Sequence, residues 1–351
     1  MLAPVIKYAI NKAKRNKYIQ HLFEAPFELD KLDKIGEFTD SYGNTFRLLG
    51  GLRTKIKPGW ERMLRSEKTK ITSDYLSRQK QNGFIAANKM VPMLNALGKS
   101  IENSDILEVG CHSGATSFAM ADMGANKVVG TEFSGYKVEA VDMEHENNEA
   151  RLNEVDDDLR TIRTNLSHLF KQGGRVSFVD DDICESGLEH NAFDIISSWE
   201  VLEHLHDPEK AFQSIYALLK EGGISIHEYN PFFCINGGHS LCTLDFLWGH
   251  TMLHDADFSR YLDEVRPQEK ERALSFYRKG LNRMTLHDIK GHIEKSGLEI
   301  ISMLPFTKEQ HLRMIDEKTL SLSQMHYPNL TLLDLAAPRV FVIARKPRHR
   351  E

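Results

Sequence analysis

Short apolar runs and amphipathic stretches alternate along the chain from Asp105 onward. Each apolar run is short enough for one buried strand, and helix-like stretches with apolar residues three and four positions apart separate the runs. Such alternation predicts parallel strands joined by helical crossovers. We expect the first five strands at DILEVGC (105–111), KVVGTEF (127–133), RVSFVDDDI (175–183), FDIISSW (193–199) and ISIHEYNP (224–231).

Two later helices carry start and stop signals. The run DPEKAFQSIYALLK (207–220) predicts an amphipathic helix that ends before Gly222 and Gly223. In TLHDIKGHIEKSG, Thr285 and Asp288 resemble a capping box with Asp in place of Glu, so a second helix is expected to begin there.

Two strand patterns in succession complete the alternation, LEIISMLPF (298–306) and RVFVIARKP (339–347). The crossover between the second and third strands, 136–172, is longer and more charged than a simple connection requires and predicts an extended, solvated helix pair. Together these patterns predict an α/β protein with a seven-stranded, doubly wound, Rossmann-like sheet.

Three segments do not follow the alternation. Residues 1–104 contain few strand-like runs and several helical ones, which predicts a helical N-terminal cap through which a homodimer is possible. Residues 232–283 begin with a stretch rich in Gly, His, Trp and Cys, and 307–337 form a further excursion. We therefore expect one catalytic domain over 105–347, with lid insertions at about 232–283 and 307–337, after the fifth and sixth strands.

Composition excludes some classes of protein. Forty-five Lys and Arg against 50 Asp and Glu give a net charge of -5, which offers no general field for attracting nucleic acid. The four cysteines form no CxxC pair and no disulfide framework, which favours a cytoplasmic location. No apolar run approaches the roughly 20 residues that span a bilayer. The basic segment 1–23 is loosely amphipathic and favours an ordinary surface helix over a membrane-bound one.

The turn after the first strand carries the first candidate chemistry. Gly110 and Gly114 bracket a tight turn that opens a helix at Ala115; glycines let the backbone approach a ligand, and the helix start supplies free N–H groups. Glu132 follows Glu108 by 24 residues and ends the second strand, where an acid can accept both hydroxyls of a ribose.

Three acids, Asp180, Asp181 and Asp182, end the third strand. One of these carboxylates can meet an adenine amino group while the next backbone N–H meets the ring. Three acids in a row leave open which of them does so.

These features, with the run SSWEVLEHLHDPEKAF (197–212) at the fourth strand, resemble class I S-adenosylmethionine-dependent methyltransferases of the small-molecule type, similar to the ubiquinone-biosynthesis methyltransferases. The resemblance is strong over 105–231 and extends in strand order over 285–347. It implies the methyltransferase form of the sheet, S-adenosyl-L-methionine as cofactor, and methyl transfer to a small-molecule acceptor.

The resemblance also implies cofactor-binding roles for residues at matching positions. Glu108, Gly110, His112 and Gly114 would line the methionine end, Glu132 the ribose with Phe133 beside it, Asp182 and Ile183 the adenine, and Trp199 and Glu200 the floor that faces the acceptor. The family often has glycine at the position of His112, so the turn is more crowded here. The His112 side chain could contact the methionine carboxylate or the acceptor, or simply pack.

Two other functions are weaker alternatives. The GxGxxG fingerprint of nicotinamide-dependent oxidoreductases is broken, because the chain offers Gly110, His112 and Ala115, and such an enzyme would end its sheet in a parallel strand. A non-catalytic cofactor-binding interaction protein is the other alternative. The Asn230–Pro231 pair resembles the NPP signature of amino-methylating DNA enzymes, but that signature belongs after the fourth strand, so methylation of nucleic acid is discounted.

Acceptor chemistry is expected beyond the fifth strand. Tyr229 and Asn230 would orient the acceptor, and the aromatic-, His- and Gly-rich loop 231–255 supplies His239 as the first candidate for a general base and His250 as the second. A hydroxyl acceptor needs such a base, whereas a thioether does not. We expect O- or S-methylation and leave the acceptor open.

Two further sets of residues rank lower. His204 and His206, just past the fourth strand, are weaker candidates for the base. Cys234, His239, Cys242 and His250 could be read as a zinc set, but their spacing matches no standard finger. We expect no metal.

Overall fold

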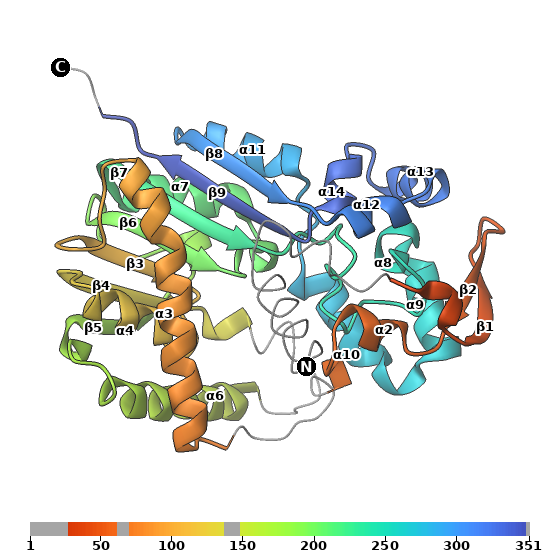
Figure 1. Ribbon diagram of the computed structural model, residues 1–351, viewed down its shortest axis with the longest axis horizontal. Coiled ribbons are helices and arrows are strands. Elements are labelled where there is room, and N and C mark those ends of the chain that lie inside the picture. The colour runs from red at the N-terminus through yellow and green to blue at the C-terminus, as the bar shows by residue number, and fades with distance from the viewer. Residues whose placement is uncertain (1–26, 62–69, 137–147, 349–351) are drawn as a thin grey trace, which may run out of the picture.

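The computed structural model describes residues 27–61, 70–136 and 148–348, and the side chains of all of these except 148–155 (Figure 1). The basic segment 1–23 lies outside these ranges, so the predictions made for it are not addressed. Within the described parts of the chain, no helix is both long enough and apolar enough to cross a membrane.

A seven-stranded sheet forms the centre of the molecule, in the order β5-β4-β3-β6-β7-β9-β8. Its strands are β3 (Asp105–Val109), β4 (Lys127–Glu132), β5 (Val176–Asp180), β6 (Phe193–Trp199), β7 (Leu219–Tyr229), β8 (Glu299–Phe306) and β9 (Arg339–Arg345). The first five run parallel, and β9 lies antiparallel between β7 and β8. The predicted seven-stranded α/β sheet is confirmed, and the antiparallel β9 argues against the oxidoreductase alternative.

Helices cover both faces of this sheet (Figure 1). On one face lie α3 (Ser73–Ala96), α4 (Ala115–Asp122) and α6 (Asn148–Ser167), and on the other lie α7 (Pro208–Leu218) and α11 (Leu286–Lys295). Side chains of a strand alternate between faces, so Ile106 packs in the α3 and α4 core while Leu107 packs in the α7 and α11 core. This double burial explains the nearly continuous apolar strands.

Local signals set the starts of two helices. The Asp207 side chain accepts a hydrogen bond from Lys210 N at 3.1 Å, and Pro208 occupies the first turn of α7. Thr285 and Asp288 cap α11 reciprocally, which confirms the predicted capping box.

The end of α7 differs from the prediction. The helix ends at Leu218, and β7 begins at Leu219, so Gly222 and Gly223 lie inside a strand and do not stop a helix. The reason is pairing with β6: Leu219 already opposes Phe193, and the register then shifts while Gly222 adopts a φ of 72°. A glycine-assisted bulge lets the strand begin earlier than the helical pattern suggests.

The N-terminal part also differs from a purely helical cap, because it contains the hairpin β1 (Lys34–Thr39) and β2 (Thr45–Leu49). Phe46 of this hairpin stacks on Phe246 with ring centroids 4.5 Å apart, and Phe38 packs edge-on against Tyr261. The hairpin thus shares one apolar core with the two segments expected as insertions.

The other α-helices of the described residues belong to the same region. They are α2 (Leu52–Ile56), α8 (Gly249–Met252), α9 (Asp255–Val265), α10 (Lys270–Ser275), α12 (Glu309–Met314), α13 (Glu317–His326) and α14 (Leu332–Ala336). Figure 1 shows them gathered with the hairpin beside the end of the sheet toward which β7 points and at which β9 begins.

Helix α3 lies directly on the first turn of α4. A Cβ on Gly83 would be 2.2 Å from the Ala115 carbonyl oxygen, so the two backbones are in contact and only glycine fits between them. Ala115 begins α4, immediately after the turn that follows β3. The N-terminal segment therefore braces this turn from outside the sheet.

Replacing Gly83 with alanine should separate the two helices. Overpacking at a backbone contact costs about 1–3 kcal/mol, more than the ~1 kcal/mol that alanine contributes through helix propensity, so Gly83→Ala should lower the free energy of unfolding in urea. Gly291→Ala in α11 is the matched control, because no heavy atom lies within 4 Å of its added Cβ, and it should be neutral or stabilising. Equal shifts in the two variants would contradict the helix contact.

Candidate active site

A cavity of about 410 Å³ opens at the carboxyl ends of β3, β4 and β6, beside the end of β5. The chain leaves β3 toward β4 and β5 and then returns to β6 on the other side, so the strand order reverses at this point. Ligands of open α/β sheets bind at such a switch point. Eight of the ten expected cofactor residues line the cavity: Gly110, His112, Glu132, Phe133, Asp182, Ile183, Trp199 and Glu200.

The turn after β3 passes through three left-handed residues. Gly110, His112 and Gly114 have φ values of 67°, 46° and 73°. A Cβ on Gly110 would lie 2.5 Å from Val201 Cγ2, and one on Gly114 would lie 2.3 Å from Phe178 Cζ. Both glycines are therefore required by packing as well as by conformation.

His112 holds the left-handed conformation without being glycine, which strains the backbone. Its N–H donates to Glu132 Oε2 at 2.7 Å. The acid at the end of β4 thus fixes the turn after β3 and also faces the cavity.

Glu108 belongs neither to the turn after β3 nor to the lining of the cavity. It is fully buried beneath α4, where the Ser117 hydroxyl donates to its carboxylate, and it does not line the cavity. Burial raises the pKa of Glu108 to about 7. The hydrogen bond from Ser117 joins β3 to α4, the two elements on either side of the turn. Glu108 therefore supports the turn.

The three acids after β5 separate in space. Asp180 accepts the Ser134 N–H at 3.0 Å and faces away from the cavity, while Asp181 and Asp182 line it. The Asp182 carboxylate accepts the N–H of Cys184 at 2.9 Å and begins a helical turn. Two of the three acids, Asp181 and Asp182, therefore stay candidates for the carboxylate that meets an adenine amino group.

The floor of the cavity is formed at the end of β6. Glu200 has a φ of 55°, and its N–H donates to the Glu228 carbonyl at 2.7 Å. Trp199 Nε1 is buried without a hydrogen-bond partner. Lys89 of α3 lies 5.5 Å over the Trp199 ring and pairs with the Glu228 carboxylate at 2.9 Å. The N-terminal segment thus reaches the floor of the site.

His204, Tyr136 and Lys279 line the cavity on the side of the insertion. His204 Nδ1 lies 2.6 Å from the Gly280 carbonyl oxygen and 2.8 Å from the Tyr136 hydroxyl. A carbonyl oxygen only accepts, so Nδ1 carries the proton and Nε2 is the basic nitrogen. Burial lowers the pKa of His204, which keeps the imidazole uncharged near neutral pH.

Behind His204, a carboxyl group and a second imidazole lie close together. His239 Nε2 is 3.8 Å from Glu203 Oε1, and the His239 ring packs edge-on against His204 with centroids 5.0 Å apart. Glu203 is 1% exposed, and burial raises its pKa to about 8. Burial also holds the pKa of His239 well below the usual range. Both groups are therefore uncharged over part of the neutral range.

The other expected acceptor residues lie deeper. Tyr229 packs in the core beneath α7 and α11, and His250 Nε2 donates to the Phe232 carbonyl oxygen at 2.9 Å. Burial lowers the pKa of His250 to about 4. Asn230 donates its backbone N–H to Glu203 at 3.2 Å and its amide to Pro338 O at 2.6 Å. None of these three lines the cavity.

Two clusters have the residue types of metal sites. Among the described residues, the first cluster is Asp182, Cys184 and His206, and the second is Glu203, His204 and His239. In each cluster, one possible ligand atom from each side chain lies within 4.8 Å of the other two. The four residues considered from the sequence do not gather in this way, and burial raises the pKa of both Cys234 and Cys242 to about 12, so their thiols stay protonated. The absence of a metal stays a prediction.

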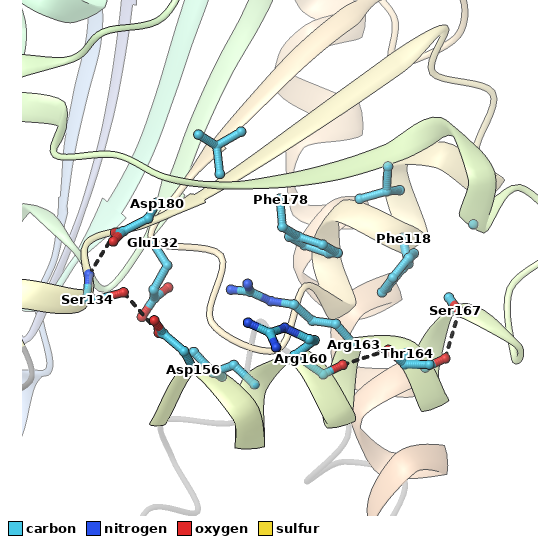
Figure 2. Close-up of a pocket in the computed structure, with 14 residues that line it drawn as sticks. Phe118, Glu132, Ser134, Asp156, Arg160, Arg163, Thr164, Ser167, Phe178 and Asp180 are labelled. Atoms are coloured by element: carbon cyan, nitrogen blue, oxygen red, sulfur yellow. Dashed lines mark hydrogen bonds between the residues drawn. The ribbon is translucent and has the colours of Figure 1, made fainter. Parts of the chain in front are cut away.

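A second cavity, of about 490 Å³, lies between α6 and the edge strand β5 (Figure 2). Glu132 lines both cavities. Asp156 and Asp180 hold Ser134 at one end, through its hydroxyl and its N–H, each at 3.0 Å. Figure 2 shows Arg160 and Arg163 projecting from α6 into the space between this acidic end and Phe178.

Sequence reasoning missed several residues of the site. Glu203 stands in the run that carried the family resemblance, so a signal for it existed. Tyr136 directly follows the second strand region, where cavity residues are expected. Lys279 and Gly280 come from the insertion and carry no local signal, because only the tertiary fold brings them to His204.

Comparison with known proteins agrees with this architecture. Residues 85–303 match the family model described as "Methyltransferase domain". A 119-residue stretch is 31% identical to ubiquinone biosynthesis O-methyltransferase from Cronobacter sakazakii, and this stretch covers 34% of the chain and 39% of that relative. The chain thus matches about two fifths of the relative's length.

Solved structures overlap more distantly. Phosphoethanolamine N-methyltransferase 2 from Haemonchus contortus is 19% identical, with 76% of this chain and 53% of that chain covered and a TM-score of 0.42. An S-adenosylmethionine-dependent methyltransferase from Mesorhizobium loti is 16% identical, with 72% and 96% covered and a TM-score of 0.41. The family model spans more than half of the sequence and the whole cavity-bearing half of the sheet, so the chain belongs to the methyltransferase domain family.

Proposed function

We propose that the enzyme methylates a hydroxyl oxygen of a small-molecule acceptor. The observation that carries this proposal is His204, an uncharged imidazole on the cavity wall whose Nδ1 is occupied and whose Nε2 is the basic nitrogen. A base is needed when the acceptor atom bears a proton of high pKa, as a hydroxyl does. The partial match to a relative named as an O-methyltransferase supports the same acceptor atom.

The residues present suit the cofactor. S-adenosylmethionine, when bound, supplies a methyl group on a positively charged sulfur. Glu132, Asp182 and Glu200 bring carboxylates to the cavity, which favours a cation. The unpartnered Nε1 of Trp199 offers a donor at the floor.

We assign the roles as follows. Glu132 binds the ribose hydroxyls, Asp182 and Ile183 contact the adenine, and the turn through Gly110 and His112 contacts the methionine end. Glu108 and Gly114 support this turn from the α4 side and do not touch the cofactor. Phe133 and Trp199 contribute apolar contact area to the cavity lining.

For the transfer itself, the chain has to align the acceptor and remove one proton. As the acceptor oxygen bonds to the methyl carbon and the sulfur–methyl bond breaks, the hydroxyl proton passes to His204 Nε2. The carboxyl group of Glu203 lies within the same cluster and, in its ionised form, would stabilise the charge that forms on the imidazole. His239 packs behind His204 and holds it in place.

His250, Tyr229 and Asn230 do not line the cavity, so in this scheme they do not contact the acceptor. Asn230 donates to Glu203 and so positions the cluster. His250 and Tyr229 lie in cores away from the cavity, and the low pKa of His250 reflects its burial. These placements favour His204 over His250 as the base.

The cofactor assignment predicts the effect of removing Glu132. Glu132→Ala loses both the cavity carboxylate and the acceptor for the His112 N–H, so S-adenosylmethionine affinity measured by calorimetry should fall by about tenfold or more. The surface variant Glu189→Ala should bind as the parent does. Unchanged affinity in Glu132→Ala would refute the assignment of this cavity to the cofactor.

The base assignment predicts the effect of removing His204. His204→Asn should lower kcat by roughly 10²–10⁴-fold with the natural acceptor, while the exposed control His190→Asn should keep parental rates. In the parent, kcat/KM should be flat above neutral pH and fall on the acid side below pH 6.5, because the pKa of His204 is lowered from that value. A thioether acceptor would show neither effect, and mass identification of the product would then reveal S-methylation.

The buried carboxyl predicts a pH dependence of stability. The pKa of Glu203 is raised from 4.5 to about 8, so as pH rises between these values the unfolded chain loses the proton that the folded chain retains, and stability falls. Glu203→Gln does not titrate, so its stability relative to the parent should increase between pH 5 and pH 8, by up to a few kcal/mol in urea unfolding. Parallel pH curves for the parent and the variant would show that Glu203 is ionised in the fold.

A further inference from the structure

Helix α6 reaches the turn after β3 through the side chain of Arg163. Arg163 Nε and Nη2 both donate to the His112 carbonyl oxygen, at 2.9 Å and 2.7 Å, and Nη2 also lies 3.5 Å from Cys111 Sγ. Hydrogen bonds from a charged donor are stronger than those between neutral groups. None of the roles assigned above uses this contact.

The contact falls at the strained residue of the turn. His112 adopts a φ of 46°, which a residue with a side chain rarely does. Its N–H is held by Glu132, and its carbonyl is held by Arg163. Because the next peptide is planar and trans, fixing the His112 carbonyl also fixes the direction of the Ser113 N–H.

Arg163 is itself held in place. Its guanidinium lies 4.3 Å over the Phe178 ring of β5, a stacking that its planar shape permits. Phe178 in turn packs where a Cβ on Gly114 would be, 2.3 Å from Cζ, and edge-on against Phe118 of α4. Figure 2 shows Arg163, Phe178 and Phe118 in this arrangement.

We propose that Arg163 is a positioning residue for cofactor binding. It compensates for histidine at a position that needs a left-handed backbone, by holding the His112 carbonyl in the orientation that presents the turn to the cofactor. This inference rests on the proposed placement of the methionine end of the cofactor at the turn. It assigns a binding role to α6, an element whose described side chains line the second cavity but not the first.

A matched control lies one turn earlier on the same helix. Arg160 is exposed and also lines the second cavity, but its guanidinium donates to the neighbouring Asp157 at 3.1 Å. Arg160→Ala therefore removes the same charge from the same helix without removing a bond to the turn.

The first experiment compares cofactor binding by calorimetry in the full-length protein. Arg163→Ala should weaken S-adenosylmethionine binding by about tenfold and raise its KM similarly, with kcat at saturating cofactor and the acceptor KM little changed. Arg163→Lys keeps the positive charge but not the planar guanidinium with its two donors, so the affinity of this variant for S-adenosylmethionine should be intermediate. Arg160→Ala should bind as the parent does.

The second experiment uses the strain at His112 as an independent readout. Glycine adopts the left-handed conformation without strain, so in a His112→Gly background the turn needs less support. Adding Arg163→Ala to that background should weaken binding by less than twofold to threefold, compared with about tenfold in the parent. If Arg163→Ala alone fails to fold, the Arg163→Lys variant in the two backgrounds gives the same comparison.

Three outcomes decide the matter. Equal affinities of Arg163→Ala and Arg160→Ala, with Glu132→Ala still weakened, would overturn the role of Arg163 and leave the cofactor cavity intact. Equal losses from Arg163→Ala in both backgrounds would overturn its link to the strain at His112. Unchanged binding in Glu132→Ala as well would overturn the cavity assignment on which the inference rests.

Discussion

No side chain can be accommodated at Gly110 or Gly114, because an added Cβ would lie 2.5 Å from Val201 and 2.3 Å from Phe178. The backbone of this turn is therefore packed on both sides at the carboxyl edge of the sheet, between the turn after β6 and a side chain of β5. Its conformation depends on elements far apart in the sequence. Glu132 fixes the His112 N–H from β4, and the α3 backbone at Gly83 braces the start of the following helix. A backbone close enough to contact a cofactor thus constrains the packing of three neighbouring strands and two helices.

Buried acids and cavity acids have different environments. Glu108 and Glu203 are fully buried, and burial raises their pKa values to about 7 and about 8. Each has hydrogen-bond donors, Ser117 for the first and the Asn230 N–H for the second, which lessen the cost of burial. Because these two groups are partly protonated near neutral pH, fixed negative charge at the cavity comes from the acids that line it. That distribution places negative charge where a sulfonium can be bound and keeps the supporting carboxyl groups nearly neutral.

The strands and the acids at their ends could be predicted from the sequence because both depend on local pattern. An apolar run and the residue that ends it are adjacent in the chain, and parallel strands carry such residues to one edge. Glu108 shows the limit of this reasoning. It precedes the strand end by one residue, and its side chain shares the face of Ile106, so it points under α4 and not into the cavity.

Other features depend on contacts that no local pattern reveals. The hairpin β1–β2 has alternating apolar residues, yet it is stabilised by stacking of Phe46 on Phe246, two hundred residues later. Likewise, His204 could not be preferred over the other histidines as a base before the hydrogen-bond partner of its Nδ1 was known. Gly280 O, from the insertion, decides which nitrogen of His204 carries the proton.

The insertion between β7 and α11 therefore contributes chemistry as well as shape. Asn282 donates its N–H to the Glu203 carbonyl at 2.8 Å and its amide to Leu202 O at 2.6 Å, which joins the end of the insertion to the turn after β6. Gly280 lies two residues before this junction, so its carbonyl is held against His204. The end of the cavity proposed for the cofactor is built from one contiguous half of the sheet. The end proposed for the acceptor takes its imidazole from the turn after β6, and the hydrogen-bond acceptor for that imidazole from the insertion. In the proposed mechanism, a change in the insertion would consequently alter the tautomer of His204 together with the space available to the acceptor, so it would couple acceptor choice to base strength.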